Sequence, residues 1–219
     1  MAEKLRTYSS DDIDVSWSLK RCIHAQECVK GMPAVFDVQK RPWIQPEQAP
    51  SADELAAVVE RCPTGALHYD RKDGGPGEPT PEANRITLEA DGPLYVLGDA
   101  TLEMPGDETA LTDTRIALCR CGASKNKPFC DNTHKDEDVA FKDDGNPQVS
   151  SLGPEAATTP LSINPAKDGP LLIGGQFEIV TALGTVAFRG DKTALCRCGA
   201  SSNKPFCDGS HHRIGFEAE

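Results

Sequence analysis

The sequence predicts an α+β protein, with a helix-containing N-terminal part followed by a β-rich part that is built twice. Two observations carry this prediction. A capping-box pattern, Ser51-Ala-Asp-Glu54, opens a helical segment in the first third of the chain. Further on, a shift of 77 residues lays Leu118 on Leu195, and 14 of the 17 residues up to His134 and His211 are identical. This internal duplication divides the chain into three modules.

Composition and charge limit the classes of function. The 219 residues include 34 acidic and 23 basic side chains, and the formal net charge of −11 argues against a nucleic-acid partner. The N-terminus lacks the apolar core of a signal peptide, and no apolar run approaches the roughly 18 residues that span a bilayer. We expect a soluble, cytoplasmic protein without a membrane partner. In a reducing compartment, nine cysteines favour metal ligation over disulfides.

Two segments, 71–84 and 143–160, are rich in Gly, Pro and acidic or small polar residues, which is typical of linkers. They separate three predicted domains, residues 1–70, 85–142 and 161–219. Each has about 60 residues, a size at which a hydrophobic core alone is marginal and a metal centre commonly adds stability.

The elements follow from local signals. The helix of the first domain is expected from Ala52 to Arg61 and ends against Cys62-Pro63. After each later cysteine loop, Asp131 or Asp208 is expected to cap a short helix whose backbone N–H groups face the cysteines. Runs of strand-forming residues between turns predict strands at 86–89 and 94–97 in the first copy, and at 161–164, 171–173, 176–181 and 185–189 in the second.

Each copy carries three cysteines and one histidine in the spacing C-x-C-x8-C-x3-H. These residues are Cys119, Cys121, Cys130 and His134 in the first copy, and Cys196, Cys198, Cys207 and His211 in the second. One interpretation is a closed tetrahedral zinc site, which would stabilise a small domain. The C-x-C pair is tighter than the usual C-x2-4-C zinc pattern, however. It suits two sulfurs on one iron of a binuclear centre, whose second iron the other cysteine and the histidine would hold.

The run Cys207-Asp-Gly-Ser-His211 is similar to the signature of the CDGSH iron-sulfur domains, the mitoNEET-like family, and the ligand spacing matches in both copies. The first copy departs from the signature at Asn132 and Thr133, which lie between ligands. The resemblance implies a [2Fe–2S] cluster on each set of three cysteines and one histidine. It also implies an intramolecular pseudo-dimer with a shared β-cap and short cluster-binding helices.

The charges around these ligands bear on the reduction potential. A histidine ligand in place of a thiolate removes negative charge and raises the potential of a cluster. Arg120 and Arg197 each stand between two cysteine ligands, where a cation would act in the same direction. The alternative is that both are ordinary solvated loop charges.

The three N-terminal cysteines, Cys22, Cys28 and Cys62, form another pattern. Together with Pro63, they resemble the ligands of a mono-cluster bacterial-type ferredoxin, except that Ala25 stands where a fourth cysteine is expected. The resemblance implies a ferredoxin-like α/β sandwich that binds a [3Fe–4S] cluster, or a [4Fe–4S] cluster with a fourth ligand other than cysteine. His24 is the nearest candidate for that ligand, and Trp17 and Trp43 are candidates to shield the cluster. The alternative is a decayed module with three unmetallated thiols.

The sequence contains no dinucleotide-binding, P-loop or nucleophile-elbow pattern, so we expect an electron carrier and not an enzyme. Two other functions fit the same ligands: storage, delivery or sensing through a labile cluster, and a zinc-stabilised interaction module. The expected partner is a redox protein, with a basic surface to match the acidic charge, or an apo-protein that accepts a cluster. The duplication favours a monomer.

Overall fold

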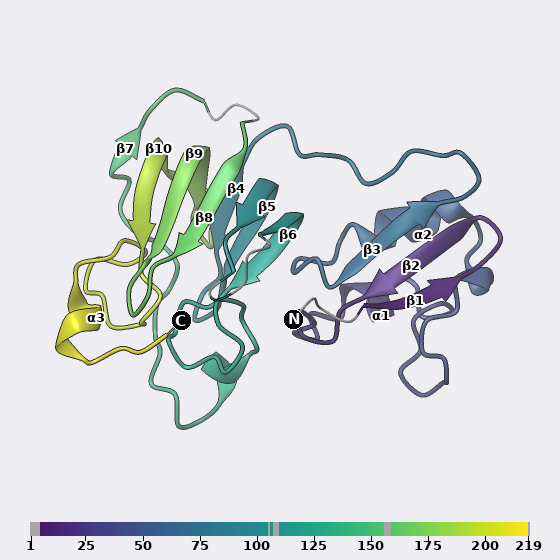
Figure 1. Ribbon diagram of the computed structural model, residues 1–219, viewed down its shortest axis with the longest axis horizontal. Helices are drawn as coiled ribbons and strands as arrows, with labels where there is room; N and C mark the ends of the chain where they lie inside the picture. Colours follow the sequence, from purple (N-terminus) through teal and green to yellow (C-terminus); the bar gives the residue numbers. More distant parts are fainter. Residues whose placement is uncertain (1–4, 105, 107–109, 156–158, 219) are drawn as a thin grey trace. The chain divides into compact units, whose positions relative to one another are not determined.

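The computed structural model describes residues 5–104, 106, 110–155 and 159–218. The chain divides into two compact units, Met1–Pro79 and Thr80–Glu219 (Figure 1). Each unit has its own hydrophobic core. Most of the regular structure is β, with a few short helices. Among the helices of the described ranges, none has the length and apolar character needed to cross a bilayer.

The first unit holds a three-stranded antiparallel sheet in the order β1-β2-β3. Buried and half-buried residues alternate along β2, which is the pattern of a strand with one face on a core. The core collects Val15, Phe36, Leu55 and Val59, all without solvent exposure. The elements are β1 (Arg6–Ser9), β2 (Ile13–Trp17), α1 (Glu27–Gly31), η1 (Pro46–Gln48), α2 (Ala52–Val59) and β3 (Leu67–Arg71).

Helix α2 begins as the sequence predicts and ends two residues early. The Ser51 hydroxyl accepts the backbone N–H of Glu54 at 3.2 Å, so Ser51 is the N-cap. The helix ends at Val59, because the chain turns through Glu60 and Arg61 toward Pro63, which disfavours helical backbone before it. Cys62 is therefore presented on the turn that follows a capped, packed helix.

The second unit is built on one seven-stranded sheet to which both copies contribute (Figure 1). Strand β5 pairs with β6 along one side, while β9 pairs with β10. Strands β4 and β8 share the space between β5 and β9, because each pairs with both of them. The elements are β4 (Arg85–Leu88), β5 (Leu94–Leu102), β6 (Leu111–Leu118), η2 (Thr133–Lys135), β7 (Ser151–Leu152), β8 (Leu161–Pro165), β9 (Leu171–Val180), β10 (Val186–Leu195) and α3 (Ser210–Arg213).

The pairing between copies repeats with the same register. Strand β4 runs parallel to β9 with Arg85 opposite Glu178, and β8 runs parallel to β5 with Ser162 opposite Thr101. Arg85 moved forward by 77 residues falls on Ser162, and Glu178 moved back by 77 residues falls on Thr101, so the second pair is the first with the two copies exchanged. The two copies are thus related by a pseudo-twofold exchange in which the first strand of each completes the sheet of the other.

The strands are longer than the sequence predicts. The runs 171–173 and 176–181 form one strand, β9, because Gly174 and Gly175 allow a close approach instead of breaking the strand. A Cβ on Gly175, whose φ is +96°, would lie 2.4 Å from the carbonyl oxygen of Pro160. Strand β6 is not predicted, since polar residues interrupt its apolar pattern, yet Asp113 and Arg115 are buried there.

The two segments expected to be linkers carry structural contacts. Asn84 is fully buried, and its side-chain amide donates to the carbonyl oxygens of Thr159 and Gln176 at 2.6 and 2.8 Å. Segment 143–160 contains β7, which pairs with β10. Residues 80–84 of the first segment and the described residues of segment 143–160 therefore belong to the second unit, whereas residues 71–79 belong to the first. The predicted boundaries between the two copies stay predictions.

Candidate metal centres

Of the four candidate ligands of the first copy, the three cysteines lie in the loop between β6 and η2 and His134 lies in η2, and together they form two pairs. The Cys119 and Cys121 sulfurs are 3.8 Å apart, and Nδ1 of His134 lies 3.5 Å from the sulfur of Cys130. Cys119 and Cys130 are buried, whereas Cys121 and His134 are half-buried.

The second copy repeats this geometry. The Cys196 and Cys198 sulfurs are 3.8 Å apart, and Nδ1 of His211 lies 3.4 Å from the sulfur of Cys207. The ligand loops of both copies lie at the same end of the strands (Figure 1). His211 is more enclosed than its counterpart His134, with 8% of its surface exposed.

These separations match two donors on one tetrahedral metal. With metal–sulfur bonds of about 2.3 Å and metal–nitrogen bonds of about 2.0 Å, two sulfurs lie about 3.8 Å apart, and a sulfur and a nitrogen about 3.5 Å. Within the described parts of the chain, no three His, Cys, Asp or Glu side chains are grouped closely enough to hold a single ion. The donors of each copy therefore come as two pairs, each with the spacing for one metal.

Backbone N–H groups face the sulfurs in both loops. In the first copy, Ala123 donates to Cys121 and Asn132 to Cys130, both at 3.4 Å, and in the second copy Gly209 donates to Cys207 at 3.4 Å. Such donors stabilise thiolates and thereby favour the ligating form. The sequence predicted N–H groups aimed at the cysteines, and the structure places them there.

The N-caps of the short helices differ from the prediction. Asn132 and Gly209, in the left-handed conformation, occupy the N-cap positions in place of Asp131 and Asp208. The aspartates instead tie the helix to the ligand loop, since Asp208 accepts the N–H groups of Ser210 at 3.0 Å and Ser202 at 2.8 Å. Hydrogen bonds from Ser210, then from Ser202, hold the pKa of Asp208 well below its usual range.

Burial affects the ligands directly. It raises the pKa of the Cys130 thiol to about 11 and lowers the pKa of His134. The imidazole is thus kept neutral, which is the form that binds metal, whereas the buried thiol has to release its proton when metal binds.

The arginines between the ligands are buried anchors. Arg120 and Arg197 are each 1% exposed, so the interpretation as solvated loop charges is wrong. Arg120 donates to the carbonyl oxygens of Gly92, at 3.0 Å, and Glu89, and pairs with Asp143 at 2.8 Å. Their burial was not evident from the sequence, because arginine is rarely enclosed without partners, and these partners are distant in the chain.

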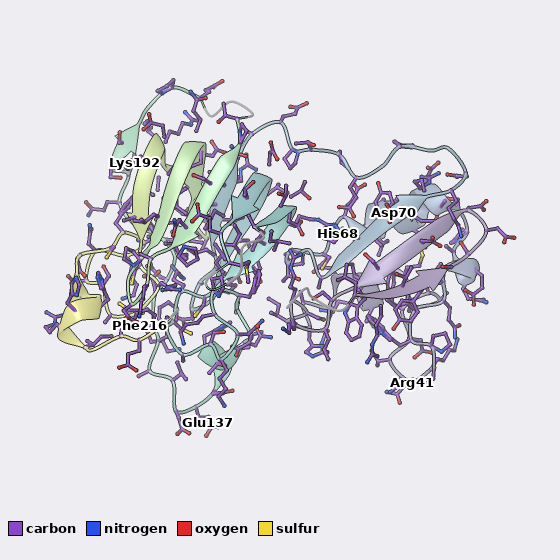
Figure 2. The ribbon with its side chains drawn as sticks, in the orientation of Figure 1. Arg41, His68, Asp70, Glu137, Lys192 and Phe216 are labelled. Atoms are coloured by element: carbon purple, nitrogen blue, oxygen red, sulfur yellow. The ribbon has the colours of Figure 1, made fainter. Side chains whose placement is uncertain are left out.

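Arg197 is the corresponding buried anchor in the second copy. Arg197 donates to the carbonyl oxygens of Gly169 at 3.0 Å and Ala166 at 2.6 Å. Its guanidinium lies 5.5 Å from the ring centre of Phe216, which is labelled in Figure 2. Each arginine thus joins its ligand loop to the Asp-Gly-Pro turn that precedes the central strand of the same copy.

The two ligand loops meet each other. An isolated antiparallel bridge pairs Cys121 with Cys198, one ligand from each copy. A Cβ on Gly122 would lie 2.5 Å from the carbonyl oxygen of Cys198, and one on Gly199 would lie 2.4 Å from that of Cys121. The glycines after the C-x-C pairs are required by this close approach, and the two candidate centres are neighbours.

The N-terminal cysteines line a common cavity of about 820 Å³. Burial, with the negative charge of Cys62 and then Cys22, raises the pKa of Cys28 to about 11, so the three sulfurs share one electrostatic environment. Ala25 and His24 line the same cavity, and Nδ1 of His24 lies 4.0 Å from the sulfur of Cys22. His24 is exposed, with a left-handed φ of 55°. The structure therefore brings the predicted set together.

The aromatic pair predicted to shield this site also lines the cavity. The Trp17 and Trp43 rings pack edge to face, with centres 5.1 Å apart. Arg41, at the tip of the loop before Trp43, lines the cavity rim (Figure 2). The sequence singled out the two tryptophans by composition, but gave no sign that both indole nitrogens are buried.

Comparisons with known proteins agree with these sites. A family model described as a divergent 4Fe-4S mono-cluster matches residues 8–72, and a model described as an iron-binding zinc finger of CDGSH type matches residues 91–135 and 168–212. The chain is 36% identical over 67 residues to proteins of Escherichia coli K12 and O157:H7, both described as uncharacterized protein YjdI. The match covers 31% of this chain and 87% of each relative. No solved structure matches the chain.

All candidate ligands lie within these matches, and the predicted resemblance is confirmed for each module. The chain therefore contains a divergent 4Fe–4S mono-cluster domain followed by two tandem iron-binding domains of CDGSH type.

Proposed function

We propose that the protein is an electron carrier with two [2Fe–2S] clusters and a third, N-terminal cluster. Cys119, Cys121, Cys130 and His134 would hold the first cluster, and the corresponding residues of the second copy would hold the second. Cys22, Cys28 and Cys62 would hold a [3Fe–4S] or [4Fe–4S] cluster. The observation that carries the proposal is the arrangement of the CDGSH donors as two metal-spaced pairs in each copy.

The donor pairs favour a binuclear cluster over a zinc ion. A structural zinc site needs four donors around one point, so that every pair of donors is separated by less than about 4 Å. A [2Fe–2S] cluster needs two separate pairs, one on each iron. The four pairs in this chain have the second arrangement, which supports iron-sulfur binding over the zinc-stabilised interaction module.

The residues around each site suit a centre that changes charge. A bound [2Fe–2S] cluster supplies one-electron chemistry. The chain's own part is to fix the donors on a rigid sheet, to direct backbone N–H groups at the thiolates and to replace one thiolate by a neutral imidazole. These features offset negative charge and raise the potential at which an electron is accepted. Because one-electron chemistry needs no group that acts on a substrate bond, we propose a carrier without catalysis of its own.

The partner is proposed to be a protein. The chain carries a formal net charge of −11, which would attract a basic surface on a redox partner. The reciprocal pairing of β4 with β9 and β5 with β8 supports a monomer whose shared β-cap is completed within one chain. A cytoplasmic location is part of the same proposal.

One observation favours cluster delivery as a second function. His134 is half-buried and lines an open cavity of about 510 Å³ together with Glu89, Asp91 and Lys135. An acceptor protein would reach this ligand from solvent, whereas His211 is enclosed. Delivery would therefore proceed from the first copy.

Timed mixing with an apo-ferredoxin separates the two functions. The purified, loaded protein is cycled between oxidised and reduced states, and then incubated with the apo-ferredoxin while the spectrum of each protein is followed. An electron carrier retains its clusters through repeated cycles and through the incubation. Transfer of the [2Fe–2S] cluster to the acceptor within the time of one redox cycle would contradict the electron-carrier proposal and support cluster delivery.

A further inference from the structure

The N-terminal cavity contains two hydrogen-bond donors that nothing in the description above uses. The indole nitrogens of Trp17 and Trp43 are buried, and neither meets an acceptor among the described residues. Neither indole N–H is hydrogen-bonded to a described cysteine sulfur either. Both tryptophans line the same cavity as Cys22, Cys28 and Cys62. A buried N–H without an acceptor is costly, and such groups in native proteins usually meet a ligand, an ion or an ordered water.

The positions of the two rings are set by their surroundings. Trp17 ends β2, opposite Leu67 of β3, and is 8% exposed. Trp43 lies beside the bridge that pairs Phe36 with Ile44, and its ring centre is 6.1 Å from that of Phe36. The two indoles also pack edge to face, so a rotation of either ring would break this contact. The donors are therefore preorganised.

The donor set fits an iron-sulfur cluster. Cluster sulfides and cysteine thiolates are anionic acceptors, and hydrogen bonds to them are one of the means by which a protein tunes a cluster. We propose that the indole N–H groups of Trp17 and Trp43 donate hydrogen bonds to the sulfurs of the N-terminal cluster and raise its reduction potential. The inference rests on the N-terminal cluster of the proposed function. It assigns to this pair a positioning and tuning role that goes beyond shielding from water.

The direction of the effect follows from charge. Reduction adds negative charge to the cluster, so a donor N–H stabilises the reduced form more than the oxidised form. Replacing a tryptophan by phenylalanine keeps an aromatic ring and removes the N–H. We expect Trp17→Phe and Trp43→Phe each to lower the ratio of reduced to oxidised centre about tenfold at a fixed ambient potential, which is about 59 mV for one electron.

The test is a redox titration of the full-length loaded protein, followed by EPR, with the two CDGSH centres as an internal reference. Phe36→Leu is the matched control, because Phe36 belongs to the same aromatic cluster and carries no N–H. The expected result is a lowered potential of the N-terminal centre in both tryptophan variants, with the control and the CDGSH centres unchanged. A shift no larger than that of Phe36→Leu overturns the inference and assigns the indoles to water or to packing.

A second measurement needs no substitution. The chain contains two tryptophans, so 15N-labelled indole reports on Trp17 and Trp43 alone. Pulsed EPR of the labelled protein is expected to show 15N coupling to the N-terminal centre, and its absence overturns the inference even if the variants fail to fold. Iron and sulfide sufficient only for the two CDGSH centres would overturn the N-terminal cluster as well. A loaded third centre without coupling overturns the hydrogen bonds alone.

Discussion

At the scale of single residues, the proposed histidine ligands would set the charge of each CDGSH centre. In the proposed clusters an imidazole takes the place of a fourth thiolate, and the Nδ1 atoms of His134 and His211 face the sulfurs of Cys130 and Cys207. We expect His134→Cys to lower the reduction potential of the first centre, because a fourth thiolate adds negative charge that disfavours the reduced state. An EPR-monitored titration measures this shift. His211→Cys should act on the second centre alone, and a potential that stays constant or rises in both variants would contradict the ligand assignment.

Arg120 is expected to be the most sensitive residue that is not a ligand. Its side chain is fully enclosed, and the Asp143 carboxylate that pairs with it is 13% exposed. Arg120→Met removes the charge partner of that carboxylate and one hydrogen-bond donor to each of the carbonyl oxygens of Gly92 and Glu89, so the second unit should lose about 3–5 kcal/mol of unfolding free energy. Denaturant unfolding measures the loss. The control is Lys125→Met, an exposed change in the same loop, and equal stability of the two variants would refute the anchoring role.

The spacing of residues in the sequence predicts some of the residue roles and not others. The ligand sets were predicted because cysteine and histidine spacing maps directly onto coordination. The roles of Arg120, Asp143 and Phe216 were missed, because each depends on contacts between residues that are far apart in sequence. The unsatisfied indole nitrogens were missed for the same reason, since burial of one atom is a property of the packed structure.

At the scale of elements, the close approach of the two ligand loops depends on glycine. Gly122 has a φ of +82°, and a Cβ there would meet the backbone of Cys198. We expect Gly122→Ala to lower the free energy of unfolding by about 2–3 kcal/mol. It should also weaken cluster binding at both centres, because the strained contact lies where the two ligand loops meet. Gly184→Ala is the matched control, because Gly184 has the same φ but open space around it. Thermal unfolding compares the two, and an equal effect would mean that φ alone matters.

The elements were predicted in part, for physical reasons. Helix α2 follows from its capping box and from Pro63 beyond its end, both of which are local signals. Strand β6 was missed because it buries Asp113 and Arg115, which local patterning places on a surface. The break expected near Gly174 and Gly175 was wrong, since Gly175 makes room for the backbone at Pro160 and Leu161 and Gly174 makes room for the Ser162 side chain. Neighbours across a sheet decide such cases, and a single sequence does not show them.

At the scale of the whole molecule, duplication lets one chain build a paired arrangement. Phe141 lies between Arg120 of its own copy and Lys204 of the other, at 5.3 and 6.0 Å, and Phe216 lies in the same way between Arg197 and Lys127, at 5.5 and 5.8 Å. Each ligand loop is therefore supported by the other copy, and neither CDGSH module is expected to hold a cluster when expressed alone.

The two halves of this arrangement differ in exposure. His134 lines an open cavity, whereas His211 is enclosed. A chelator in excess should therefore remove the two CDGSH clusters in two phases, with the first copy losing its cluster severalfold faster. Absorbance followed over time measures the phases, and the altered spectrum of His134→Cys assigns them. Loss in one phase, or faster loss from the second copy, would be inconsistent with this difference.

The central claim is that each CDGSH motif holds a binuclear iron-sulfur cluster and not a zinc ion. The direct measurement is iron, acid-labile sulfide and zinc per full-length chain purified without air. The account predicts about four irons and four sulfides from the CDGSH motifs, with a total of about seven or eight irons when the N-terminal site holds a [3Fe–4S] or [4Fe–4S] cluster. A colourless protein with about two zinc ions and no sulfide would contradict it.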